Sequence, residues 1–516
     1  MPTSTPVSPV AVLDLGATAI RLVIAEVTAP GGIRVLEEAS RAILTGRDTF
    51  ASGSIAPGTI DRVVDAVQKF RTLMDQYGVA DVHAVATSAV REARNRDVFL
   101  DRVQARTGIE FEVINEAEES RLLFLALRKS VGRHPAFKGA WTLLVEVGGG
   151  STSLTLLRKG EPNRSGVYAL GAIRLRQQLD LRRHTHEVQV ALLKRYIANV
   201  IDEVRLDIPL RRITHMIAMG GDVRFAASQI LEADFDQSAS EVSRDALLGF
   251  CDRLERLDEE RIADQFRLQA VEAETLLASM LVYRTLLAET SARRVLISDA
   301  SLRAGLLLDV SEPGEAAAAD FGSQVIASAE ALGFKYRFDR EHGRHVAMLA
   351  TRLFDELGPE HGLGRRERLL LEVAAVLHDI GMYVSLRAHH KHSQYIIAAS
   401  QIFGLSDEET MLVSNVARYH RRGLPQRSHL PYVALDRGDR LIVNKLAAIL
   451  RLANALDAEH LQKITGLKLV REGRVWVLEL AGDGDLTMEL LAGRARADLF
   501  EQTFGRELAV KTMTGR

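Results

Sequence analysis

Two stretches decide the fold of this 516-residue chain: residues 10–27, VAVLDLGATAIRLVIAEV, and residues 141–157, WTLLVEVGGGSTSLTLL. In each, an apolar run with β-branched residues carries one acid near its end, Asp14 or Glu146. Glycine follows, and then a second apolar run. Apolar runs separated by a glycine turn predict strand hairpins. Their repetition indicates an internal duplication, with two similar halves facing each other across a cleft.

The rest of the chain divides by its pattern. Strand and helix signals alternate as far as residue 310, which predicts an α/β architecture. From Phe321 to about Asp457 the pattern is amphipathic helix, and strand alternation returns at Ile464. The stretch SEPGEAAAAD (311–320) is the predicted linker. The expected domains are 1–130 and 131–312 (α/β), 318–460 (helical) and 461–516 (a small α/β cap).

Composition excludes several classes of protein. Lys plus Arg (66) nearly balance Asp plus Glu (68), which argues against a globally basic protein that binds nucleic acid or a membrane surface. The single cysteine, Cys251, excludes a disulfide framework and a cysteine-rich zinc site. The N-terminus does not resemble a signal peptide, and no apolar run approaches the roughly 18 residues of a membrane span. We therefore expect a cytoplasmic protein without nucleic-acid or membrane partners.

The glycines of the second hairpin are suited to phosphate. Three consecutive glycines at 148–150 allow the backbone to approach a ligand closely and to point N–H groups at an anion. The Ser and Thr that follow add hydroxyl donors. Asp14 and Glu146 are expected nearby, where carboxylates hold a hydrated Mg²⁺ against substrate oxygens. The alternative is a tight hairpin turn with both acids solvated.

Seven motifs follow one another within residues 10–310: DLGATAIRLVI, ATSAVREARN, EAEESRLLFL, VEVGGGSTSL, LGAIRL, MGGDVR and SDASLRAGLL. In these motifs and their order the chain resembles the Ppx/GppA family of exopolyphosphatases and guanosine pentaphosphate phosphohydrolases. The resemblance implies two ribonuclease-H-like domains of the actin, Hsp70 and sugar-kinase superfamily, followed by an all-α HD-like domain and the small α/β cap.

The resemblance implies that water, assisted by Mg²⁺, removes the terminal phosphate of linear polyphosphate or of guanosine pentaphosphate (pppGpp). Glu119, in EESR, matches the residue that orients this water, with Asp14 and Glu146 completing the catalytic set. A carboxylate within hydrogen-bond reach of a water can fill that role. The alternative is that Glu116, Glu118 and Glu119 only favour the positive end of their helix. A homodimer and binding of guanosine penta- or tetraphosphate are also expected. The expected phosphate-binding residues are Gly16, Thr18, Arg91, Gly148, Gly149, Gly150, Ser151 and Thr152.

The chain departs from the family pattern at several turns. Its first turn reads Gly-Ala-Thr-Ala at 16–19 instead of Gly-Ser-Asn-Ser, Glu146 replaces Asp, and Ser153 replaces Glu. Gly220-Gly221-Asp222 stands for the later Gly-Thr turn. Because a displacement of about 1 Å at a catalytic group costs roughly 10²-fold in rate, a second hypothesis stays open. In it, the chain is a regulatory protein that binds polyphosphate or the alarmone with a weakened active site.

Basic residues form two clusters that are candidates for a polyphosphate track, although most such runs are solvated faces. The first cluster is Arg174, Arg176, Arg182, Arg183, Lys194 and Arg195, and the second is Arg418, Arg421, Arg422 and Arg427.

Ten of the 15 histidines follow residue 340. Their order with two aspartates resembles HD-domain metal phosphohydrolases. Such a donor set suits Mn²⁺, Fe or Zn²⁺ and can activate water, so a third hypothesis is an HD-type hydrolase regulated by the front half. Against it, Met382 follows HDIG where active cyclic-dinucleotide phosphodiesterases usually have lysine. The implied ligands are His342, His378, Asp379 and Asp457, with His392 and His420 for a second metal.

Overall fold

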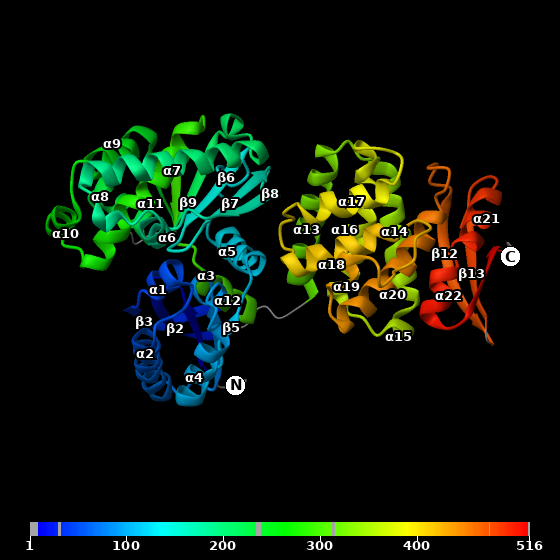
Figure 1. The fold of residues 1–516 in the computed structure, drawn as a ribbon, viewed down its shortest axis with the longest axis horizontal. Helices are drawn as coiled ribbons and strands as arrows, with labels where there is room; N and C mark the ends of the chain where they lie inside the picture. Colours follow the sequence, from blue (N-terminus) through cyan, green and yellow to red (C-terminus); the bar gives the residue numbers. More distant parts are fainter. Residues whose placement is uncertain (1–8, 29–31, 234–238, 312–314, 474, 514–516) are drawn as a thin grey trace, which may run out of the picture. The chain divides into compact units, whose positions relative to one another are not determined.

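The computed structural model describes residues 9–28, 32–233, 239–311, 315–473 and 475–513. The chain divides into two compact units, Met1–Ala318 and Ala319–Arg516, each of which has its own core (Figure 1). Within the described residues, no helix is both long enough and apolar enough to cross a membrane.

The first unit opens with a five-stranded sheet in the order β3-β2-β1-β4-β5. β1 pairs antiparallel with β2 and parallel with β4, which confirms the hairpin predicted at residues 10–27. The strands are β1 (Pro9–Leu15), β2 (Ala19–Thr28), β3 (Gly32–Ala42), β4 (Asp81–Ala86) and β5 (Glu112–Val113), and the helices are α1 (Thr45–Ser52), α2 (Pro57–Gln76), α3 (Ser88–Arg91), α4 (Arg96–Thr107) and α5 (Glu116–Val131).

The alternation of side chains along β1 decides on which face of the sheet Asp14 lies. Successive side chains of a strand point to opposite faces of the sheet. Ala11 and Leu13 pack in the core with α2 and α4, whereas Val12 packs on the other face with residues of α5. Asp14 therefore shares the face of Val12 and lies one residue from the end of the strand, next to the helix that begins at Glu116.

The second sheet repeats the arrangement, in the order β10-β11-β9-β6-β7-β8. β6 pairs antiparallel with β7 and parallel with β9, as β1 does with β2 and β4. Val145 and Val147 enter the core of this half, so alternation places Glu146 on the opposite face. The predicted duplication is confirmed. The strands are β6 (Thr142–Val147), β7 (Thr152–Arg158), β8 (Glu161–Tyr168), β9 (His215–Met219), β10 (Ala239–Ser243) and β11 (Arg294–Ser298).

The helices of this half flank its sheet. One buried tyrosine on α11 ties two strand ends together: Tyr283 Oη donates to the Met219 carbonyl and accepts from the Val147 N–H at 3.1 Å. The helices are α6 (Ala172–Gln178), α7 (His186–Asp207), α8 (Gly221–Leu231), α9 (Arg244–Leu254), α10 (Glu259–Phe266) and α11 (Ala270–Glu289), with 3₁₀ turns at Leu181–Arg183 and Leu210–Arg212.

The helix after the second sheet packs on the first. α12 (Leu302–Ser311) contacts α5, β1 and β2. The approach is close, since a Cβ added at Gly305 would overlap the backbone carbonyl of Leu122. This packing brings the first turn of α12 to the same face of the first sheet as Asp14.

The second unit is a helical bundle followed by a small sheet, β12-β13-β14, which confirms the predicted helical domain and α/β cap. The predicted linker is too long, because α13 begins at Glu315; residues 312–314 lie outside the described residues. The elements are α13 (Glu315–Lys335), α14 (Arg340–Glu356), α15 (Gly358–His361), α16 (Arg365–Leu377), η3 (Ile380–Tyr383), α17 (His389–Ala398), α18 (Asp407–Arg418), α19 (Leu430–Val433), α20 (Arg437–Ala455), β12 (Ile464–Glu472), β13 (Val475–Gly482), α21 (Thr487–Ala495), α22 (Asp498–Phe504) and β14 (Glu507–Thr512).

Candidate active site and histidine cluster

A cavity of about 390 Å³ lies in the first unit, and both hairpin turns line it. Residues 16–19 come from the first turn and residues 148–151 from the second. The first residues of α8 and α12 line the cavity as well. Helix N-termini carry unpaired N–H groups and partial positive charge, which favour a bound anion such as phosphate.

The glycine turn at 148–150 approaches the first half so closely that larger residues have no room. A Cβ at Gly149 would lie 2.8 Å from Thr18 Cγ2, and one at Gly150 would overlap Ser88 Oγ. The Gly150 carbonyl accepts from Arg174 Nε at 2.5 Å, which fixes the turn. In the described part of the chain, the N–H groups of Gly149 and Gly150 donate to no protein acceptor. They are thus available to an anion in the cavity.

Three predicted catalytic acids meet in this cavity: Asp14, Glu119 and Glu146 all line it. Burial raises the pKa of Glu119 to about 7; the charges of Asp14 and Glu116 add to this, and Arg91 opposes it. Burial, followed by the charges of Glu119 and Asp14, raises the pKa of Glu146 to about 8. Negative charge in this cavity therefore makes ionisation of Glu119 and of Glu146 less favourable.

Glu146→Gln is expected to stabilise the metal-free protein at pH 8 by on the order of 1–2 kcal/mol and to have little effect at pH 5. A raised folded-state pKa means that the native protein holds extra protons between about pH 4.5 and 8, so its stability falls as the pH rises through that window. Glutamine carries no charge to desolvate. Thermal unfolding in EDTA at both pH values measures the difference, and a variant no more stable than the parent at pH 8 contradicts the prediction.

Three arginines that the sequence analysis did not select line the cavity: Arg21, Arg224 and Arg303. Arg303 Nη1 lies 3.3 Å and Arg21 Nη1 3.6 Å from Asp14 Oδ2. The pairing of the hairpin strands could have predicted Arg21 beside Asp14, because the two residues are direct cross-strand partners. The other two lie within quoted motifs, MGGDVR and SDASLRAGLL.

Two residues expected to bind phosphate are placed elsewhere. Arg91 does not line the cavity; its Nη1 donates to the Ile114 carbonyl at 2.7 Å and lies 3.5 Å from Glu119 Oε2. Thr152 is fully buried, and its hydroxyl donates to the Leu170 carbonyl at 2.8 Å. These contacts hold both side chains in place within the protein. The remaining predicted phosphate ligands line the cavity: Gly16, Thr18, Gly148, Gly149, Gly150 and Ser151.

The first basic cluster is largely neutralised by neighbouring acids and so does not form an uncompensated basic track. The ion pairs are Arg174–Glu92, Arg176–Glu274, Arg182–Glu274, Arg183–Asp180 and Lys194–Glu255.

Histidines meet in the interior of the second unit, and most of the predicted set is among them. His342, His378, Asp379 and His420 lie together, but the partner of His420 is His389 rather than His392. His392 is half-buried and belongs to neither group of donor atoms described below. His389 opens α17 one turn earlier in the same His-His-Lys-His run, and nothing in the sequence pattern separates the two.

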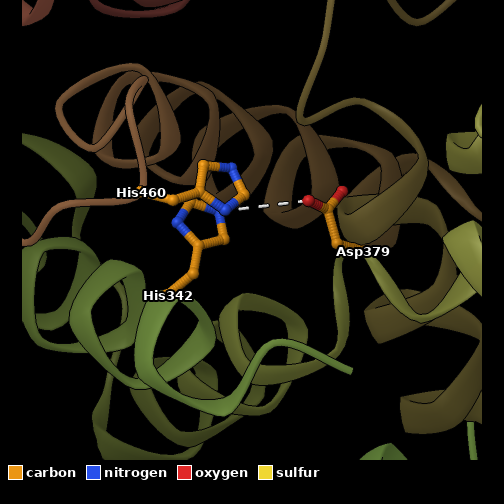
Figure 2. Close-up of side chains that lie close together, drawn as sticks. All are labelled: His342, Asp379 and His460. Carbon is orange, nitrogen blue, oxygen red and sulfur yellow. Dashed lines mark ion pairs between the residues drawn. The ribbon is translucent and has the colours of Figure 1, made fainter. Parts of the chain in front are cut away.

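Among the described residues, two groups of three side chains could hold a metal ion. Within each group the donor atoms lie within 4.8 Å of one another. The groups are His342, Asp379 and His460, and Asp379, His389 and His420. Figure 2 shows the His460 ring stacked on that of His342, and the His342–Asp379 ion pair. The centroids of the two stacked rings are 3.6 Å apart. Asp457 Oδ2 accepts a hydrogen bond from His342 Nδ1 at 2.7 Å. This hydrogen bond orients the His342 ring, and the ligand role expected of Asp457 stays a prediction.

Comparisons with known proteins show two kinds of similar sequence. Part of the chain is 32% identical over 167 residues to exopolyphosphatase 1 of Mycobacterium leprae; the match covers 32% of this chain, which thus spans about half (48%) of that relative. The guanosine-5'-triphosphate,3'-diphosphate pyrophosphatase of Vibrio vulnificus is 23% identical over 89% of this chain and 90% of its own.

A solved structure supports the fold. The exopolyphosphatase of Cytophaga hutchinsonii, 23% identical, matches 60% of this chain and 99% of its own with a TM-score of 0.54. The predicted pair of α/β domains is thereby confirmed. The model of the Ppx/GppA phosphatase family matches residues 23–312, and that of its domain III matches residues 326–492. The chain therefore belongs to the Ppx/GppA phosphatase family.

Proposed function

We propose that this chain hydrolyses the terminal phosphoanhydride bond of linear polyphosphate, with pppGpp as the alternative substrate of the same site. The observation that carries the proposal is that the 148–151 turn lines the same cavity as Asp14, Glu119 and Glu146. The relatives named as exopolyphosphatase and as guanosine-5'-triphosphate,3'-diphosphate pyrophosphatase support this substrate class.

Glu119 is the residue we assign to the attacking water. Its pKa of about 7 is close to neutral pH, where a carboxylate is most effective in accepting a proton from water. Arg91 fixes its position through the 3.5 Å ion pair and through the carbonyl of Ile114. Backbone N–H groups of the glycine turn and the starts of α8 and α12 stabilise negative charge on the phosphoryl oxygens.

The cavity fits a divalent cation. Among the described residues, its lining has six carboxyl groups but only three arginines, so a polyanionic substrate requires added positive charge. Asp14 and Glu146 would hold Mg²⁺, which binds carboxylates together with substrate phosphates. When bound, the ion neutralises charge on the phosphates. Its presence also favours the ionised form of Glu146, whose pKa the nearby charge of Asp14 helps to raise in its absence.

Ser153 marks where this cavity differs from the family pattern. Its hydroxyl lies 3.5 Å from that of Ser120, and both residues line the cavity. A pair of neutral hydroxyls thus occupies a position where the family usually has a glutamate. The proposed hydrolysis relies on the remaining acids. The regulatory hypothesis instead predicts binding of the substrate without turnover.

Phosphate release from long polyphosphate and from pppGpp, assayed side by side with Mg²⁺ and with Mn²⁺, tests the proposal. We expect release from polyphosphate that requires the divalent ion and stops in EDTA. The relative rates on the two substrates assign the preference. Binding of either substrate without turnover under every condition would overturn the proposal and favour the regulatory hypothesis.

A further inference from the structure

Three side chains in the second unit bring metal-binding atoms close together. His389 Nε2 and His420 Nε2 are 3.2 Å apart, and Asp379 Oδ1 lies 3.1 Å from the first and 3.3 Å from the second. Two ligands bound to one metal ion at about 2.1 Å are about 3.0–3.4 Å apart when they subtend about 90–109° at the metal. All three separations fall in this interval.

Backbone contacts leave both Nε2 atoms as electron-pair donors. His389 Nδ1 lies 3.1 Å from the Leu386 carbonyl, and His420 Nδ1 lies 2.6 Å from the Ala417 carbonyl. A ring nitrogen this close to a carbonyl oxygen carries the proton, so the lone pair of the neutral ring is on Nε2. Hydrogen bonds of this kind orient metal-binding histidines in proteins.

The position of Asp379 favours a metal ion over a proton as the group that bridges the two histidines. Its Oδ1 is buried and lies 3.1 Å and 3.3 Å from the two Nε2 atoms, and it has no donor when both rings carry their protons on Nδ1. One proton added to either Nε2 can bridge to only one of the other two atoms, which leaves the third without a partner in the interior. A metal cation satisfies all three atoms together.

We propose that Asp379, His389 and His420 bind one divalent transition-metal ion. Two imidazoles and one carboxylate suit Zn²⁺, Mn²⁺ or Fe²⁺. Three protein ligands leave at least one position for water or another ligand. The site lies in the second unit and does not depend on the hydrolysis proposed for the first.

The neighbouring histidine pair does not require a metal. His342 and His378 Nε2 are 3.2 Å apart, but the side-chain amide of Asn454 lies 3.1 Å from both. With its NH₂ turned toward them, this amide donates to both rings. We therefore assign a single ion, on the Oδ1 side of Asp379.

A Co²⁺ titration of the full chain, after removal of metals with a chelator, tests the assignment. Co²⁺ bound by imidazole and carboxylate in a site of low coordination number has visible absorption bands much stronger than those of the hydrated ion. We expect these strong bands to saturate at about one Co²⁺ per chain, to be lost on displacement by Zn²⁺, and to be accompanied by a higher unfolding temperature in the loaded protein. A parent protein that shows none of these three changes overturns the proposal.

Two ligand variants and one matched control locate the ion. His389→Gln and His420→Gln should each weaken Co²⁺ binding by at least about 10²-fold. His392→Gln, one turn further along α17, should bind like the parent. Circular dichroism checks that each variant is folded, and the titration of the parent decides the question if a ligand variant is not. Loss of binding in His392→Gln with retention in His389→Gln would place the ion elsewhere.

Discussion

Glu119→Gln is expected to lower phosphate release from polyphosphate by about 10²–10⁴-fold, the usual contribution of a positioned acid–base group. Glutamine has nearly the same shape and keeps one oxygen toward the cavity, but it cannot accept a proton from water. Phosphate release at saturating polyphosphate measures the loss. Because the affected group acts on the water, the loss should fall on kcat rather than on substrate affinity.

Glu118→Gln is the matched control for this variant. Glu118 precedes Glu119 on the same helix, but it pairs with Arg121 at 2.7 Å and does not line the cavity. It should therefore retain the activity of the parent. Equal activity in the Glu119 variant and the parent would remove Glu119 from the water-orienting role. Activity that survives Glu119→Gln but disappears in His378→Ala would instead favour the HD-type hydrolase hypothesis.

The pH dependence of the parent follows from the same carboxyl. Because Glu119 must be ionised to accept a proton and its pKa is raised to about 7 in the metal-free protein, activity should rise with pH through the neutral range. A bound divalent cation favours the ionised form. Increasing Mg²⁺ should therefore move this rise to lower pH.

Local pattern was sufficient to predict the strands that carry the site. The acid near the end of each hairpin strand, Asp14 or Glu146, follows from alternation, because position in a strand fixes the face of the sheet. The convergence of both acids with Glu119 in one cavity required the family motifs, since the three residues come from three different elements.

Side-chain hydrogen bonding is what the sequence could not reveal. Thr152 and Arg91 carry the right donors for phosphate, yet the structure uses them on the carbonyls of Leu170 and Ile114. Both carbonyls belong to segments distant in the chain from the residue that binds them. Donor type alone therefore does not distinguish a ligand contact from a structural one.

The histidine run shows the same limit in a helix. His389 and His392 are separated by one turn of α17 and have the same chemistry. Which of them meets His420 depends on how deeply α17 packs against α18 and η3, a tertiary contact without a local signature. Asp457 is a similar case, because its place behind His342 depends on the end of α20.

Gly171→Ala is expected to reduce phosphate release by roughly 10²-fold and to destabilise the protein by about 1–3 kcal/mol. Gly171 has ordinary extended backbone angles, so the requirement for glycine is one of space. A Cβ there would overlap the carbonyl carbon of Gly150 and the nitrogen of Ser151, and would lie 2.5 Å from the Gly149 carbonyl oxygen. All three atoms are backbone of the phosphate-facing turn, so the turn itself must move.

Gly249→Ala separates displacement of the turn from the general effect of removing a glycine. Gly249 is exposed within α9, and no atom lies within 4 Å of a Cβ added there, so alanine should stabilise the helix by about 0.5–1 kcal/mol and leave activity unchanged. Thermal unfolding and phosphate release are measured on both variants. If Gly171→Ala matches the parent in stability and in activity, the turn can shift without loss. Close packing against Gly171 then does not set the position of its N–H groups. If it loses stability but keeps full activity, the turn contributes to the fold and not to phosphate binding.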